Sequence, residues 1–133
     1  MTSPLPLMTV DRLVELHRQG MELYGGASPP PRLDCLEGCI GNAEQACLYM
    51  SGSVDPLQYS GYLIYYLVQN HCALDGNKRI GWMAMMDVLR AQDFDLRATD
   101  DEAEEFVNSI VQHRRDAETA IEWIAERLMA PRP

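Results

Sequence analysis

The sequence predicts an all-α protein, a single compact bundle of about six helices. Apolar residues recur at helical spacing in six segments, and several of these segments begin at a residue type that commonly caps helices. No alternation of apolar and polar residues continues beyond a few positions, so no long strand is expected. The 133 residues, 47% of them hydrophobic, suffice for one domain with its own core. We expect one domain over 1–133, with flexible ends at 1–8 and 130–133.

Three helices are predicted in the first half of the chain. Thr9 is a suitable N-cap for the first helix, and Gly25-Gly26 ends it. The prolines at Pro29-Pro30-Pro31 then require an irregular or extended connection. Asp55 followed by Pro56 is a strong start for the third helix, which is apolar over most of its circumference and is expected to cross the core. These helices are expected at about residues 9–24, 33–50 and 55–69.

Three more helices are predicted in the second half. The fourth follows a short polar loop, and its inward face is expected to hold Ile80, Ala84 and Val88. Residues 93–97 are expected to form a turn or a short extended piece. Thr99 and Glu102 make a capping box for the fifth helix. These helices are expected at about residues 76–91, 99–113 and 116–128.

The charge and hydropathy of the chain limit its partners. Its net charge is -9, with 20 acidic residues against 11 basic ones, which disfavours direct binding of a nucleic acid backbone. No apolar stretch is long enough to span a bilayer, and the N-terminus lacks the basic start and long apolar run of a signal peptide. We therefore expect a cytoplasmic protein that contacts neither membrane nor nucleic acid directly.

The four cysteines are interpreted as reduced residues of the core. Cys35, Cys39 and Cys47 are separated by four and eight residues, so on a helix they would share one face. Such a face is typical of small buried apolar side chains in a reducing compartment. A zinc site is the alternative, but the chain has no second pair of ligands at zinc spacing. We therefore expect neither a disulfide nor a zinc site.

One loop, His71-Cys72-Ala73-Leu74-Asp75-Gly76-Asn77-Lys78-Arg79, has the residues for phosphate chemistry. The first N–H groups of a helix lack internal partners and lie at the positive end of its dipole, so they bind anions. Gly76 lets an anion approach this backbone, and the side chain of Asn77 adds a donor. Lys78, the one lysine in the chain, and Arg79 add positive charge. The segment therefore predicts an anion-binding nest in an otherwise acidic protein.

Two further residues of the loop extend this prediction to group transfer. Asp75 beside a bound phosphate requires a bridging cation, and Mg²⁺ is the ion that prefers such oxygen ligands. His71 is placed to accept a proton from an attacking hydroxyl. Each of these residues alone is more often structural, but their joint occurrence in this order favours phosphoryl or nucleotidyl transfer. His17 and His113 have no partners at useful spacing and are expected to be structural.

The same nine residues resemble the signature of the Fic/Doc family, H-x-F-x-[DE]-[GA]-N-x-R. With Lys78, the segment resembles the Doc (death-on-curing) branch of the family, whose pattern ends in N-K-R. The Fic branch has Gly there and a second Arg three residues after the first, at the position of Trp82. The resemblance implies a Fic/Doc-like bundle and favours phosphorylation over the Fic-type alternative, adenylylation.

The resemblance also implies roles and partners. His71 would be the general base, and Asp75 would be the Mg²⁺ ligand. The ATP phosphates would be bound by the backbone from Gly76 onward together with Asn77, Lys78 and Arg79. The resemblance makes Arg79 a catalytic residue as well. Doc-like proteins are toxins of toxin–antitoxin pairs that phosphorylate a translation protein, elongation factor Tu in the type member. Their antitoxin places a C-terminal helical segment in a groove of the toxin and blocks it.

One position departs from the family pattern. Ala73 stands where the family has a Phe that anchors the loop in the core, and we expect Leu74 or Trp82 to fill the space. Loss of a buried Phe side chain usually costs about 3–5 kcal/mol unless neighbours adapt. This departure keeps open a third possibility, a Fic/Doc-fold binding module without catalytic activity.

Overall fold

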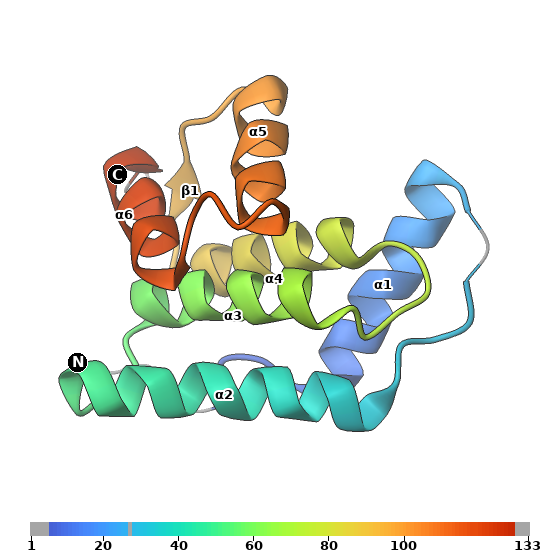
Figure 1. Ribbon diagram of the computed structural model, residues 1–133, viewed down its shortest axis with the longest axis horizontal. Helices are drawn as coiled ribbons and strands as arrows, with labels where there is room; N and C mark the ends of the chain where they lie inside the picture. Colours follow the sequence, from blue (N-terminus) through green and yellow to red (C-terminus); the bar gives the residue numbers. More distant parts are fainter. Residues whose placement is uncertain (1–5, 27, 130–133) are drawn as a thin grey trace.

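The computed structural model describes residues 6–26 and 28–129, and in them the predicted all-α class is confirmed (Figure 1). Each predicted helix is present, with ends close to their expected positions. Two very short strands, β1 and β2, form an antiparallel pair. The elements are α1 (Val10–Tyr24), α2 (Leu33–Ser51), α3 (Pro56–Asn70), α4 (Asn77–Ala91), β1 (Asp95–Leu96), α5 (Asp100–Val111), α6 (Ala117–Arg127) and β2 (Leu128–Met129).

Local hydrogen bonds explain where four of the helices begin. Thr9 caps α1 by accepting a bond from the backbone N–H of Arg12, and Asp55 caps α3 in the same way. The capping box at the start of α5 is complete, and Asp116 caps α6. Each side-chain oxygen satisfies one of the backbone donors that a helix leaves unpaired at its start. The caps predicted from the sequence are therefore confirmed.

The end of the last helix was predicted wrongly. Leu128 lies in β2 and pairs with Leu96 of β1, whereas the sequence analysis assigned it to the sixth helix. A strand of two residues has no hydrophobic period that a sequence pattern can reveal. The pair ties the end of α6 to the segment that follows α4, where residues 93–97 were expected to be a turn or an extended piece.

Helix α3 is the centre of the molecule. It packs against α2 on one side and against α4, α5 and α6 on the others, while α1 packs on α2 and α4 (Figure 1). One buried cluster lies mainly among α1 to α4, and a second joins α3 and α4 to α5 and α6. Tyr59, Leu63, Ile64 and Leu67 of α3 are all at most 1% exposed, as expected of a helix that crosses the core.

Two N-terminal residues that precede α1 belong to the core. Leu7 and Met8, which were expected in a flexible end, pack against the cluster of α1 to α4, and Met8 is buried. Pro6 is exposed, and residues 1–5 and 130–133 of the two predicted flexible ends lie outside the described residues. No helix among the described residues is long and apolar enough to cross a membrane.

The expectation for the cysteines was half wrong. Cys39 and Cys47 are buried free thiols on α2, as predicted, but Cys35 and Cys72 form a disulfide. The pair connects the first turn of α2 to the loop after α3, across 37 residues of sequence. Spacing along one helix does not reveal this partner, because only the tertiary fold brings the loop to α2.

Candidate active site

The predicted loop connects α3 to α4, and its two ends have left-handed backbone conformations. His71 is the C-cap of α3 with φ 49°, and Gly76 is the N-cap of α4 with φ 84°. The helix start has no side-chain cap, so its first backbone N–H groups keep the orientation needed for an anion. The turn therefore places an uncapped helix start directly after His71 and Asp75.

The side chain of Asn77 holds the loop in shape. Its Oδ1 accepts a hydrogen bond of 3.0 Å from the backbone N–H of Ala73, and its Nδ2 donates one of 2.7 Å to the carbonyl oxygen of Ala73. Both polar groups of the amide are thus engaged within the turn. Asn77 therefore has a structural role in the loop. Its role as a donor to a bound anion stays a prediction.

Two residues of helix α1 contact the loop. The Nε2 atom of the buried His17 donates a hydrogen bond of 2.9 Å to the backbone carbonyl oxygen of Asp75. The Cε of Met21 lies so close to Gly76 that a Cβ on that glycine would meet it at 2.6 Å. These contacts from one face of α1 thus fix the position of the turn relative to the core.

The segment before α2 secures the other end of the loop. The backbone N–H of Arg32 donates a 3.0 Å hydrogen bond to the carbonyl oxygen of Cys72, and the Nη2 of Arg32 donates one of 3.4 Å to that of His71. The Cys35–Cys72 disulfide lies beside these bonds. His71 is therefore held through its backbone, while its imidazole stays exposed to solvent.

All six predicted site residues border one open cavity of about 610 Å³. Two other helices complete its wall, because Tyr24 ends α1, while Glu104 and Val111 belong to α5. The predicted residues therefore share a single solvent-filled space large enough for a small organic ligand. They are His71, Asp75, Gly76, Asn77, Lys78 and Arg79.

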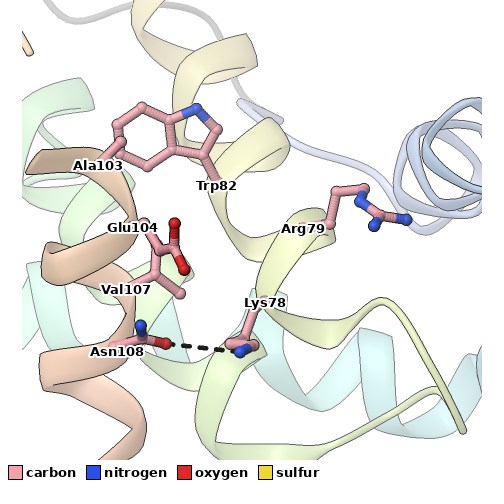
Figure 2. Close-up of a pocket in the computed structure, with 7 residues that line it drawn as sticks. All are labelled: Lys78, Arg79, Trp82, Ala103, Glu104, Val107 and Asn108. Atoms are coloured by element: carbon pink, nitrogen blue, oxygen red, sulfur yellow. Dashed lines mark hydrogen bonds between the residues drawn. The ribbon is translucent and has the colours of Figure 1, made fainter. Parts of the chain in front are cut away.

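The two basic side chains at the start of α4 point to opposite sides (Figure 2). The Nζ of Lys78 lies 3.5 Å from Oδ1 of Asn108 on α5. The guanidinium of Arg79 extends toward α1, where its Nη1 donates a 3.3 Å hydrogen bond to the carbonyl oxygen of Gly20 and its Cζ lies 4.7 Å from the ring centre of Tyr24. Lys78 is thus the less constrained cation.

A smaller cavity of about 200 Å³ adjoins this site between α4 and α5. Trp82, Ala103 and Val107 give it an apolar wall, and Lys78 lies on the border with the larger cavity (Figure 2). The ring of Trp82 makes edge contacts with Phe106 and Trp123, which stack on each other with centroids 3.9 Å apart. Trp82 is therefore part of the aromatic packing that joins α4 to α5 and α6.

The space of the missing family Phe is not filled by Leu74. Ala73 is buried, but Leu74 is 84% exposed, so the expectation for Leu74 was wrong. Consecutive residues of a turn point in different directions, and Ala73 faces the interior whereas Leu74 does not. The loop is secured by the polar contacts of Asn77 and His17 in addition to the packing of Ala73.

Sequence reasoning missed three neighbours of the site, His17, Tyr24 and Glu104. His17 was taken as a structural residue without a partner, yet it bonds to a residue 58 positions later. Tyr24 and Glu104 lie on the cavity wall, on helices whose sequences contain no signal for it. Only the packing of α1 and α5 against α4 reveals these contacts.

Comparison with known proteins agrees with the geometry of the loop. No curated protein matches the chain. The Fic/DOC family matches it over residues 7–89, more than half of its length, and this range contains α1 to α3, the loop and most of α4. The chain therefore belongs to the Fic/DOC family, whose members are generally transferases.

Proposed function

We propose that the protein transfers the γ-phosphoryl group of ATP to a hydroxyl of a target protein, as a Doc-type toxin. The observation that carries this proposal is the shared cavity. It brings an uncapped helix start, a lysine, a carboxylate and an imidazole to one solvent-filled space. These are the groups that phosphoryl transfer requires, because its catalysis consists mainly of positioning and charge stabilisation.

The residues present fit a bound Mg²⁺ and a triphosphate. The Oδ1 of Asp75 accepts the N–H of Gly76, while the carboxylate as a whole is exposed to the cavity and keeps oxygen lone pairs for a metal. Gly76 is the N-cap of α4 and makes no side-chain cap bond, so the first backbone N–H groups of the helix would be available to a phosphate. When bound, Mg²⁺ would neutralise charge on the phosphate oxygens.

His71 would act as the general base. It would accept the proton of the target hydroxyl while that oxygen bonds to the γ-phosphorus of ATP. The bond from this phosphorus to its bridging oxygen breaks, and ADP leaves. Backbone N–H groups of α4 and the ammonium of Lys78 would stabilise the charge on the transferred group. Arg79 stays a predicted phosphate ligand, although it would have to leave Gly20 and Tyr24 to reach one.

Trp82 supports phosphoryl transfer over adenylyl transfer. The Fic pattern has a second arginine at this position, whereas the indole of Trp82 packs against Phe106 and Trp123. The site therefore lacks the extra cation that the adenylylating branch uses. Adenylylation is the alternative activity, and a binding module without catalysis is the alternative class.

The proposed partners follow from the Doc branch. We propose a translation protein similar to elongation factor Tu as the target, cytoplasmic action, and an antitoxin whose C-terminal helical segment blocks the site. The apolar wall of the smaller cavity, with Trp82, Ala103 and Val107, would suit such a segment beside Lys78.

Isotope transfer tests the reaction. The protein is incubated with Mg²⁺, a translation extract and ATP labelled at either the γ- or the α-phosphate. Label from the γ position on a protein supports the proposal, and label from the α position establishes adenylylation instead. Transfer from neither position, together with retained ATP binding, supports the binding module.

A matched pair of histidine variants assigns the base. His71 and His113 both have positive φ, and asparagine tolerates that conformation better than alanine does. We expect His71→Asn to lower transfer by about 10²–10⁴-fold, the usual contribution of a general base. His113→Asn should retain full activity. Equal activity of the two variants would contradict the role of His71.

A further inference from the structure

The sulfur atoms of three cysteines converge next to the catalytic loop. Cys35 and Cys39 lie one helical turn apart at the start of α2, and Cys72 directly follows His71. The three Sγ atoms all lie within 4.8 Å of one another. A disulfide between Cys35 and Cys72 uses only two of them, and the structure holds the third, Cys39, 3.8 Å from the Sγ of Cys72.

This separation suits two thiolates that share one metal ion. A tetrahedral zinc site with Zn–S bonds of about 2.3 Å places its sulfur ligands roughly 3.8 Å apart. Cys39 and Cys72 are buried and Cys35 is half-buried, so a soft metal ion bound by the three sulfur atoms would be largely shielded from solvent. Thiolate ligands of this kind select Zn²⁺ over the hard ions that bind carboxylates.

The surroundings also provide the polar contacts that thiolate ligands need. The Nδ2 of Asn70 donates a 3.3 Å hydrogen bond to the Sγ of Cys39. The cationic side chain of Arg32 donates a hydrogen bond to the carbonyl oxygen of His71, next to Cys72. Such outer contacts orient metal ligands and stabilise their charge.

We propose that the reduced chain binds one Zn²⁺ ion through Cys35, Cys39 and Cys72, with water in the fourth position. Binding releases the thiol protons, because the ligands are thiolates. The disulfide is the competing oxidised state: two electrons and two protons from a dithiol reductant open it to two thiols and yield the disulfide of the reductant. The ion would then fasten the loop to α2 in a reducing compartment.

Titration with Co²⁺, a spectroscopic substitute for Zn²⁺, tests the site on the full chain. The protein is reduced with a phosphine, freed of metal under anaerobic conditions, and titrated with Co²⁺ while thiolate-to-cobalt absorption in the near ultraviolet is followed. We expect saturation at one equivalent and loss of the absorption when Zn²⁺ is added. Native mass spectrometry should find one Zn²⁺ per reduced chain and none on the disulfide form.

Cys39→Ser is the decisive variant, because Cys35 and Cys72 remain able to form their disulfide without it. We expect at least a tenfold weaker Co²⁺ affinity and loss of most of the absorption. Cys47→Ser, at a buried thiol of the same helix outside the cluster, should bind like the parent chain. Circular dichroism verifies that both variants are folded.

Two results would overturn the proposal. One is a reduced parent chain that gives no thiolate–cobalt absorption and carries no zinc. The other is unchanged Co²⁺ binding by Cys39→Ser. Neither result depends on phosphoryl transfer, so failure of the zinc site and failure of the proposed function are distinguishable.

Discussion

The Nε2 atom of His17 donates a 2.9 Å hydrogen bond to the backbone carbonyl oxygen of Asp75, and this bond joins α1 to the proposed metal ligand. His17 is 4% exposed, so the core fixes its position, and its hydrogen bond in turn fixes the backbone of the loop at Asp75. It touches no reacting atom. We therefore interpret it as a positioning residue for Asp75.

Replacement of His17 is expected to weaken the use of Mg²⁺. His17→Leu removes the donor, and we expect a higher Mg²⁺ concentration for half-maximal transfer along with a loss of about 1 kcal/mol in the free energy of unfolding. His17→Gln carries an amide Nε2 that retains a donor in similar reach, so it should restore most of the Mg²⁺ affinity. Equal Mg²⁺ dependence of both variants would show that His17 only packs the core.

Much of the fold was predictable because its signals are local. Thr9, Asp55, Thr99 and Asp116 each cap a helix through a bond to a residue three positions later, which a sequence displays directly. The nine-residue loop was predictable for the same reason. Its chemistry lies within one continuous segment, and the structure gathers all six of its predicted residues around one cavity.

The parts that sequence analysis missed depend on distant residues. His17 lies 58 positions before Asp75, and Cys35 lies 37 positions before Cys72. No periodicity links such pairs, because they meet only after α1 and α2 pack around α3 and α4. Leu74 shows a further limit: a hydrophobic residue in a turn is exposed when the backbone directs its neighbour, Ala73, inward.

Gly76 is expected to tolerate no side chain. Its φ of 84° is unfavourable for other residues, and a Cβ would meet Cε of Met21 at 2.6 Å. We expect Gly76→Ala to lower the free energy of unfolding by about 1–2 kcal/mol from backbone strain alone, and to reduce ATP binding. Chemical denaturation and ATP titration measure these effects.

A glycine of α2 provides the matched control. Gly41 lies inside the helix, and a Cβ there would meet nothing within 4 Å. Gly41→Ala should therefore stabilise the protein by about 0.5–1 kcal/mol, since alanine is the better helix former. Opposite signs for the two substitutions are expected, and a stabilising Gly76→Ala would contradict the left-handed turn.

Asn77 is expected to act mainly through the shape of the loop. Asn77→Ala removes the two hydrogen bonds to the backbone of Ala73, and we expect a loss of about 1–3 kcal/mol in the free energy of unfolding. Asn77→Asp keeps the acceptor and loses the donor, so its loss should be smaller. The hydrogen-exchange rate of the Ala73 amide measures the opening of the loop, and it should increase more in Asn77→Ala than in Asn77→Asp.

Asp116 is expected to make the stability of α6 depend on pH. Hydrogen bonds from the backbone N–H and the hydroxyl of Thr119 lower the pKa of Asp116 below its ordinary value of 3.8. Because the folded pKa is the lower one, the stabilisation is complete above the unfolded pKa and is lost as pH falls through the folded pKa. The parent chain should thus lose stability in acid partly through this carboxylate.

The amide variant separates this effect from the rest of acid unfolding. Asp116→Asn keeps a side-chain acceptor for the N–H of Thr119 but does not titrate in this range. Between about pH 5 and pH 2.5, its melting temperature should therefore fall less than that of the parent chain. Asp11→Asn, at an exposed carboxylate of α1 that caps no helix, serves as the comparison. If Asp116→Asn and the parent chain have parallel melting curves over this range, the cap contributes no pH-dependent stability.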